Sequence, residues 1–166
     1  MLVNAVNPGS MFYVSPGTTP VNVSTALAMA KQYPKTKFSI SDTSENLSKN
    51  LDALLRIKNN ITTIAQTNAS VKIVVTAAQL NKNASVLGKI STNYLLDVKQ
   101  VSAGNAETIA AKEHVSTISV VDGSTDIGLN LDKLQAINSK ITSITQLGRT
   151  SPMAITAAKK HRIGFS

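Results

Sequence analysis

The chain has 166 residues and a net charge of +8, from 17 basic and 9 acidic residues, and it contains no cysteine. The length predicts one domain with a sizeable core, and the lack of Cys excludes disulfides and thiolate metal sites. Only 4% of the residues are aromatic, so the core must consist of Leu, Ile, Val and Ala. The positive charge is compatible with nucleic acid, anionic lipid or acidic polysaccharide, although a basic protein without such a partner is the simpler interpretation.

The first 20 residues are expected to be an irregular lead-in that caps one end of the fold, because three prolines interrupt them. Residues 11–14 are apolar enough for a first strand. No apolar run approaches the roughly 20 residues of a membrane span, and residues 1–17 do not have the pattern of a Sec signal peptide. These observations leave a cytosolic protein, a protein exported by a route that leaves the N-terminus intact, or a fragment of a larger protein.

Helices and strands are predicted to alternate along the rest of the chain. Asp42 with Glu45 three residues later predicts a helix start, and Thr76 with Gln79 predicts a second capping box. Alternating polar and apolar residues indicate strands, and apolar residues three and four apart indicate helices. The expected helices cover 21–33, 42–59, 76–92, 102–114 and 156 onward, and Ile127, Leu131 and Leu134 form one further helical face. The expected strands cover 37–41, 61–66, 71–75, 94–98, 115–120, 141–146 and 153–155.

A long internal repeat organises this pattern. Residues 38–78 and 118–158 align without a gap, with 15 identities in 41 pairs. A shorter spacing of 24 residues, the length of one strand and one helix, relates Ile40 to Ile64. Repeats of this kind are typical of stacked architectures.

Strands joined by single helices must be parallel, and the crossover should be right-handed. We therefore predict an α/β fold: a right-handed strand–helix solenoid of five or six units, with a parallel sheet on one side and helices on the other. The alternative is a doubly wound α/β sheet, but such sheets are buried on both faces and have solidly apolar strands. The solenoid is expected over residues 21–158, followed by a basic tail over 159–166.

Several motifs resemble known repeats. Val115-x-x-Ile118-x-Val120 is similar in geometry to the core of leucine-rich repeats. The stretch 42–54, the Ile-Thr-x-Ile motifs at 61–64 and 141–144, and the stretch 114–120 resemble repeats of very large secreted bacterial surface proteins. Those proteins are adhesin-like, are often exported by type I systems, and carry calcium-binding nonapeptide arrays nearby. The resemblance implies a secreted or surface-exposed binding or spacer module that is exported by a type I-like route, with the cytosol as the alternative.

No set of residues predicts catalysis. Motifs for nucleotides or serine nucleophiles are missing from the sequence, so no catalytic residue, cofactor or metal ligand is assigned. His114 is expected at a helix end, in a structural role. Asp42 and Asp122 are expected to cap helices, and Asp52 and Asp132 to lie on solvated helix faces, with a calcium site as the alternative.

The predicted function is therefore a non-enzymatic interaction module. Its partner, a protein or a glycan, would bind small polar residues on the concave face of the sheet. These residues are Ser39, Ser41, Thr63, Ser119, Thr142 and Thr145. The alternative is a nucleic-acid or anionic-surface binder that uses the basic excess and the tail residues Lys159, Lys160, His161 and Arg162. Self-association through the open ends of the solenoid is also expected.

Overall fold

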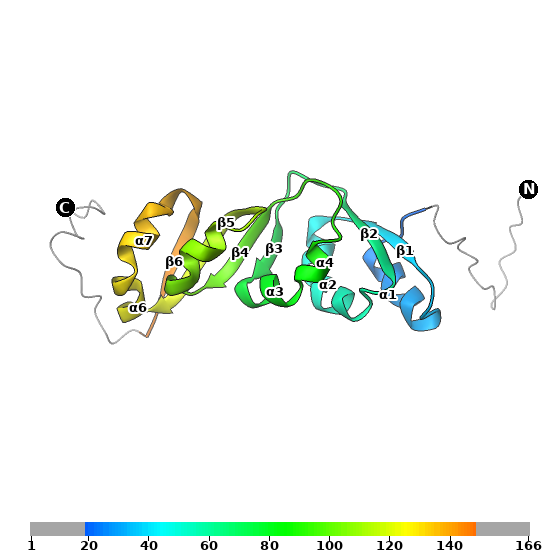
Figure 1. Cartoon of the computed structure of the whole chain (residues 1–166), viewed down its shortest axis with the longest axis horizontal. Coiled ribbons are helices and arrows are strands. Elements are labelled where there is room, and N and C mark those ends of the chain that lie inside the picture. The colour runs from blue at the N-terminus through cyan, green and yellow to red at the C-terminus, as the bar shows by residue number, and fades with distance from the viewer. Residues whose placement is uncertain (1–18, 149–166) are drawn as a thin grey trace, which may run out of the picture.

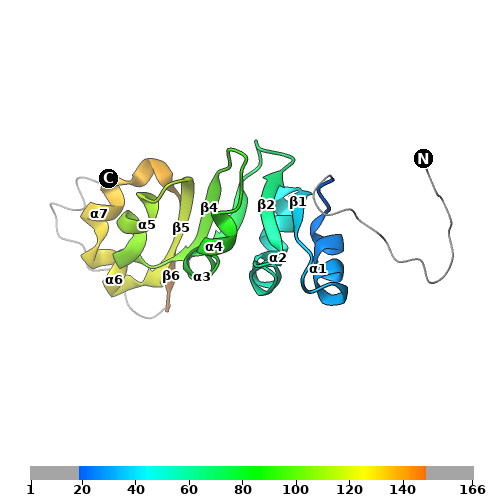
Figure 2. The ribbon, with the colours of Figure 1, turned by 45° about the vertical axis from the view of Figure 1, so that its right-hand side comes forward.

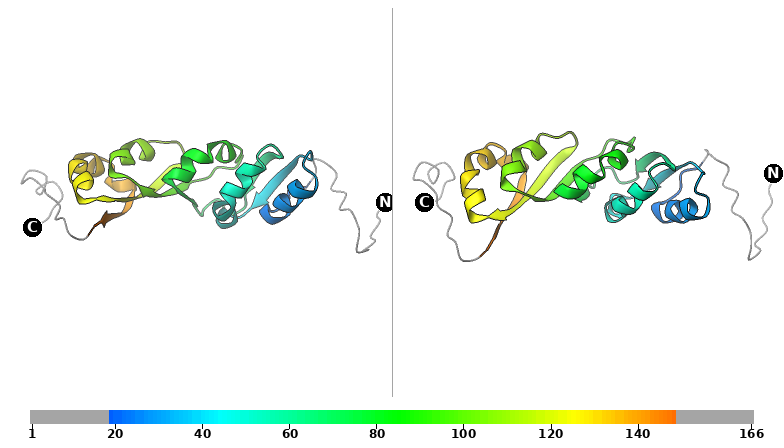
Figure 3. Two further views of the ribbon diagram at one scale, coloured as in Figure 1. Left: turned by 90° about the horizontal axis from the view of Figure 1, so that it is seen from below. Right: turned by 60° about the horizontal axis from the view of Figure 1, so that its bottom comes forward.

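A computed structural model of the chain describes residues 19–148. Strands and helices follow one another in chain order along an elongated molecule, from α1 at one end to α7 and β6 at the other (Figure 1), and two further views show the same order (Figure 3). The strands are β1 (Phe38–Asp42), β2 (Ile61–Gln66), β3 (Ile73–Thr76), β4 (Leu96–Val101), β5 (Val115–Gly123) and β6 (Ile141–Leu147). The helices are α1 (Val23–Gln32), α2 (Ser44–Arg56), α3 (Ala77–Lys82), α4 (Ala84–Leu87), α5 (Ala106–Ala110), α6 (Ser124–Leu129) and α7 (Leu131–Ala136), with short 3-10 turns η1 (Ala103–Asn105) and η2 (Asn138–Lys140).

Every strand pair is parallel, as expected for strands joined by helices. β1 and β2 form one sheet, and β3, β4, β5 and β6 form a second sheet in that order. Neighbouring strands are therefore consecutive in the chain, and neither sheet within residues 19–148 closes into a barrel. The predicted α/β class with parallel strands is confirmed, but the prediction of one continuous sheet is wrong.

The division into two sheets arises between β2 and β3. Ile64 in β2 pairs with Ile90, and six residues later Leu96 pairs with Ile73 in β3. Two consecutive segments of chain thus leave the first sheet and enter the second together, through loops over 67–72 and 91–95. These loops lie near the middle of the elongated molecule (Figure 2). Hydrogen bonds join the two segments, including one of 3.0 Å from the Gln66 backbone N–H to the Thr92 hydroxyl.

The core follows the alternation of the strands. In β1 the residues Phe38, Ile40 and Asp42 are buried, whereas the two serines between them are half-exposed. The leucines of α2 pack on this face of the sheet, because residues three and four apart share one side of a helix. These leucines are Leu47, Leu51 and Leu54, all at most 1% exposed. Burying each such side chain stabilises the fold by about 1.5–3 kcal/mol.

Several hydrogen bonds recur at positions 80 residues apart. The hydroxyl of Thr62 donates to the Phe38 carbonyl at 3.0 Å, and the hydroxyl of Thr142 donates to the Ile118 carbonyl at 3.0 Å. The side-chain amides of Asn50 and Asn130 likewise donate to the carbonyls of Asn46 and Asp126. Matching residues of the two aligned stretches therefore make matching contacts.

Two details of the expected elements need correction. Thr43, and not Asp42, is the N-cap of α2, where its hydroxyl accepts from the Asn46 backbone N–H at 3.3 Å. The helix predicted over 76–92 is divided at Asn83 into α3 and α4. The capping box of Thr76 with Gln79 is confirmed.

The lead-in with its strand at 11–14, the strand at 153–155 and the basic tail lie outside the described residues, except for Thr19 and Pro20.

Candidate functional site

Asp42 lies at the carboxyl end of β1, where parallel sheets often bind ligands. Its carboxylate accepts hydrogen bonds from the backbone N–H groups of Val23 and Thr43, both at 2.8 Å, and from the Asn46 side chain at 2.7 Å. Burial raises the pKa of Asp42, but these hydrogen bonds from Asn46, Val23 and Thr43 outweigh it, so the pKa lies below its usual value. The carboxylate is thus ionised and engaged in structural contacts.

Asp122 holds the matching position at the end of β5. Its carboxylate accepts from the backbone N–H of Ala103 at 2.9 Å and from that of Gly123 at 2.8 Å. Asp42 and Asp122 belong to different sheets, and each satisfies the first N–H of the preceding helical segment. They do not form a pair for acid–base chemistry.

Asp52 was expected on a solvated helix face, and this is wrong in part. The carboxylate accepts from Asn83 at 3.1 Å and from Gln79 at 3.4 Å, and it forms an ion pair with Lys82 at 3.0 Å. The hydrogen bonds from Asn83, Lys82 and Gln79 lower the pKa of Asp52. Asp52 therefore joins α2 to α3, whereas the matching Asp132 lies at an exposed position of α7.

His114 lies between α5 and β5 and has a positive φ of 65°. Its ring stacks on that of Tyr94 with the centroids 4.0 Å apart, and its Nδ1 lies 3.2 Å from the Tyr94 carbonyl oxygen. Burial, and then the charge of Glu113, raise the pKa of the Tyr94 hydroxyl. Among residues 19–148 no three His, Cys, Asp or Glu side chains gather in a way that could hold a metal ion.

Three of the six predicted binding residues lie on the two-stranded sheet. The hydroxyl of Ser39 lies 2.9 Å from that of Thr62 and accepts from that of Thr63 at 3.1 Å. Ser41 lies beside Ala65 on the neighbouring strand. In β1 these side chains alternate with the buried residues, and in β2 Thr62 and Thr63 are both exposed between the buried Ile61 and Ile64. The hydroxyl groups therefore lie on the face of the sheet opposite the core.

The other three lie on the four-stranded sheet, and the structure does not bring the six together. Thr145 is exposed and pairs with Val121. Ser119 is only 8% exposed, contrary to its expected place on a solvent-facing side. Thr142 lies at a register shift, and its hydroxyl donates a hydrogen bond to the Ile118 carbonyl. The break between β2 and β3 separates the two groups of three.

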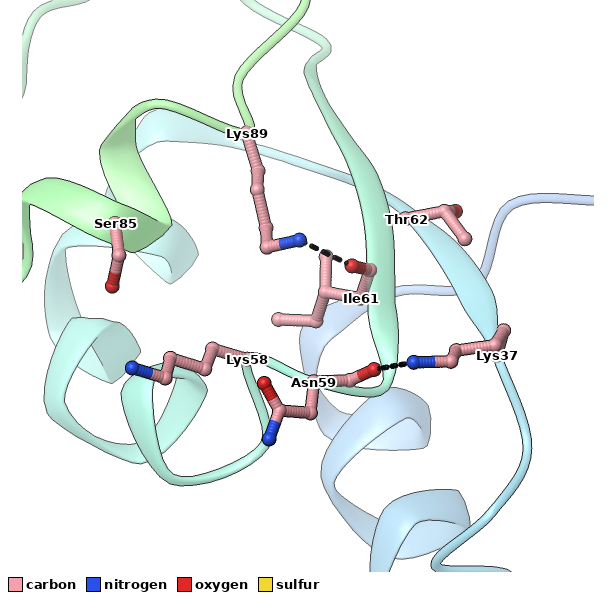
Figure 4. Close-up of a pocket in the computed structure, with 7 residues that line it drawn as sticks. All are labelled: Lys37, Lys58, Asn59, Ile61, Thr62, Ser85 and Lys89. Carbon is pink, nitrogen blue, oxygen red and sulfur yellow. Dashed lines mark hydrogen bonds between the residues drawn. The ribbon is translucent and has the colours of Figure 1, made fainter.

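A basic pocket that the sequence did not predict lies at the start of β2 (Figure 4). It is open to solvent, has a volume of about 500 Å³, and includes three lysines from three successive segments of the chain. The Lys37 amine donates to the Asn59 carbonyl, and the Lys89 amine donates to the Ile61 carbonyl at 2.7 Å. Lys58 follows the end of α2 and is exposed. The full lining is Lys37, Lys58, Asn59, Ile61, Thr62, Ser85 and Lys89.

The pocket combines positive charge with neutral hydrogen-bond donors, and no carboxylate lines it. Each lysine amine has three donors, so Lys37 and Lys89 keep donors beyond those given to the carbonyls. Phosphate, sulfate and carboxylate groups are the ligands that such a site attracts. Lys37 and Lys89 each stand one residue before a residue that pairs with β2, a relation that only the strand pairing of the structure reveals.

A second shallow pocket of about 370 Å³ lies between α3 and α5, beside Gln100. Its only charged residue is Lys112, so it contains no acid–base pair. The four residues of the predicted basic tail, Lys159, Lys160, His161 and Arg162, lie outside the part of the chain that the structure describes.

No helix among residues 19–148 has the length and the hydropathy that a membrane span requires. Comparisons with models of protein families, with curated proteins and with solved structures find no match to this chain.

Proposed function

We propose that the chain is a strand–helix solenoid that works as a non-enzymatic interaction module, secreted or displayed on a bacterial surface. Its partner is a protein or a glycan that binds the face of the sheets opposite the helical core. The observation that carries this proposal is the row of hydroxyl groups on that face, where the Ser39 hydroxyl lies 2.9 Å from that of Thr62 and 3.1 Å from that of Thr63.

Two observations support a solenoid. Within each sheet, every strand pairs with the next one along the chain, without the reversal of strand order that a doubly wound sheet requires. The hydrogen bonds of Thr62 and Thr142 to carbonyls 24 residues earlier are the same, as identical steps along a stack should produce. The break between the two sheets then represents a change of direction within the stack.

The chemistry of the face favours a polar partner. Side chains of serine and threonine both donate and accept hydrogen bonds, so they suit the hydroxyl groups of a sugar or the backbone of a protein loop. They are short, and they leave a sheet surface on which a flat ligand can lie. Val74, which is 44% exposed, adds an apolar contact to the second sheet.

A test uses a glycan array together with two double variants of the full chain. Ser39→Lys with Thr63→Lys places long charged side chains on the proposed face, and should reduce any specific glycan signal at least tenfold. The control, Ser24→Lys with Thr125→Lys, makes the same charge change at exposed positions of α1 and α6. Binding that persists in the first variant would exclude this face of the two-stranded sheet.

A second candidate function is binding to an anionic partner, such as nucleic acid or a sulfated polysaccharide. The basic pocket favours it, because Lys37, Lys58 and Lys89 line this pocket and no carboxylate does. Lys58 offers the cleanest test, since neither of the pocket's lysine–carbonyl hydrogen bonds involves it. Lys58→Ala should weaken binding to a heparin oligosaccharide and reduce its salt dependence, whereas Lys49→Ala on the exposed face of α2 is the control.

A further inference from the structure

Two matching isoleucines differ sharply in their environment. Ile64 in β2 is 0% exposed, whereas Ile144, which occupies the same place in β6, is 46% exposed. Both pair with the previous strand in the same way, since Ile64 pairs with Ile40 and Ile144 with Val120. The pairing with the previous strand therefore does not explain the difference, and the other edge of each strand differs as well.

The far edge of β2 is covered by a short parallel segment. The backbone N–H of Ile64 donates to the Lys89 carbonyl at 2.8 Å, and the N–H of Ser91 donates to the Ile64 carbonyl at 2.8 Å. Because β6 keeps the register of β2, the N–H and C=O of Ile144 point toward its far edge. β6 is the last strand of its sheet among residues 19–148, so this edge has no partner strand there.

The opposite end of the molecule presents a complementary set of groups. Val21 pairs with β1: its N–H donates to the Ser39 carbonyl and its C=O accepts from the Ser41 N–H, both at 2.9 Å. Successive residues of a strand direct their backbone groups to opposite sides. The C=O of Pro20 and the N–H of Asn22 therefore face away from β1, and neither makes a hydrogen bond within residues 19–148.

The backbone groups around Val21 match those of the short segment that already covers the far edge of β2. The acceptor and donor around Ile90 are the carbonyl of Lys89 and the N–H of Ser91, and those around Val21 are the carbonyl of Pro20 and the N–H of Asn22. Proline is compatible with this edge because only its carbonyl is needed there. The segment can thus satisfy the N–H and C=O of an isoleucine on a neighbouring parallel strand.

We propose that β6 of one molecule binds the segment Pro20–Asn22 of a second copy as an additional parallel strand. The inference goes beyond the proposed function, because it concerns the ends of the sheets and not their faces. The contact would cover Ile144 and also Leu147, and the latter residue is 57% exposed. It joins different surfaces of the two copies, so it leads to open chains of molecules unless the rotation closes a ring.

The test measures the mass of the full chain by analytical ultracentrifugation over a wide range of concentration. The mass should rise above the 17.5 kDa of one copy as concentration increases. Ile144→Pro removes the outward N–H while leaving the hydrogen bonds to β5, and should raise the dissociation constant at least about tenfold. Ile144→Ala keeps this N–H and is the matched control.

A second matched pair of variants tests the other end of the contact, at Asn22. Asn22 has a φ of −73°, which proline can adopt, so Asn22→Pro removes its N–H without changing the backbone. Both Asn22→Pro and Asn22→Ala lose the side-chain hydrogen bond to Thr25, and only the first should abolish association. Circular dichroism of all four variants checks that each is folded.

Mixing the two proline variants distinguishes this contact from other kinds of self-association. Each variant keeps one functional end, so Ile144→Pro and Asn22→Pro should be monomeric alone and should form only a dimer together. A mass that stays at that of one copy at every concentration would overturn the proposal. Association that survives both proline substitutions, or that the alanine controls reduce equally, would also overturn it.

Discussion

The carboxylate of Asp42, at the end of β1, accepts a hydrogen bond of 2.8 Å from the backbone N–H of Val23, the first residue of α1. Asp122 has the same relation to Ala103, the first residue of η1, and the sequence separation is 19 residues in both cases. Each aspartate therefore joins the end of a strand to the start of the preceding helical segment. A negative charge at this place also complements the dipole of α1.

Replacing Asp42 by alanine should lower the free energy of unfolding by about 2–4 kcal/mol, because three donors lose a charged acceptor. Asp122→Ala should cost less, about 1–2 kcal/mol, since Asp122 accepts from two backbone donors and is less buried. Urea unfolding of both variants measures the difference. Equal losses would contradict the ranking.

The lowered pKa of Asp42 predicts a pH dependence of stability. In the unfolded chain the pKa of an aspartate is about 3.9. The stabilisation that Asp42 contributes is therefore fully present above that pH, and it is lost as the pH falls through the lower pKa of the folded state. The stability difference between the natural chain and Asp42→Asn should thus be largest near neutral pH and shrink in acid. Urea unfolding at several pH values tests this, with Glu45→Gln as a control at an exposed carboxyl. A difference that grows in acid would have the wrong sign.

Gln66 and Gln146 are matching residues that should respond differently to substitution. Gln66 is 4% exposed, and its side-chain amide donates to the carbonyls of Asn68 at 2.8 Å and Val71 at 2.6 Å. Gln66→Ala should therefore cost about 2–3 kcal/mol, because it leaves these carbonyls without a donor. Gln146 is exposed, and its side-chain hydrogen bond to Gly148 is longer, at 3.3 Å, so Gln146→Ala should cost less than Gln66→Ala.

Thermal unfolding of the two glutamine variants gives the comparison directly. Limited proteolysis adds a local measure, because the loop over 67–72 should become susceptible in Gln66→Ala alone. Equal stability of the two variants would show that the contacts of Gln66 contribute nothing beyond those of an exposed residue.

Gln100 has a left-handed backbone conformation, with a φ of 57°, at a register shift between β4 and β5. This conformation costs a residue other than glycine about 1–2 kcal/mol, while glycine loses about 0.5–1 kcal/mol through the greater freedom of the unfolded chain. Gln100→Gly should thus leave the stability unchanged or raise it by up to about 1 kcal/mol. Gln100→Val should destabilise the fold, because β-branched residues rarely adopt a positive φ. Calorimetric melting of the two variants tests the order, and a more stable Val variant would contradict it.

Most of the local structure could be predicted from the sequence. The leucines at 47, 51 and 54 predicted the buried side of α2, and Thr76 with Gln79 predicted the start of α3. The 24-residue spacing of Ile40 and Ile64 predicted two parallel neighbours, which the strand register confirms. These features depend on residues close in sequence or on an exact repeat.

The basic pocket and the role of Asp42 could not be predicted in this way. Asp42 was expected to cap the helix that follows it, but Thr43 does so, and Asp42 accepts from a residue 19 positions earlier. Lys37, Lys58 and Lys89 come from three segments that only the parallel stacking of the chain brings to one place.

The amino-acid pattern alone determined most of the residues that face the interior and most of the segments that are extended or helical, because burial imposes a period of two on a strand and of about 3.6 on a helix. Tertiary structure alone decided that the strands divide into two sheets between β2 and β3, and that the edge at Ile64 is covered. Alternation identifies the buried face of a strand, whereas the choice of a neighbouring strand depends on backbone hydrogen bonds between residues far apart in the chain.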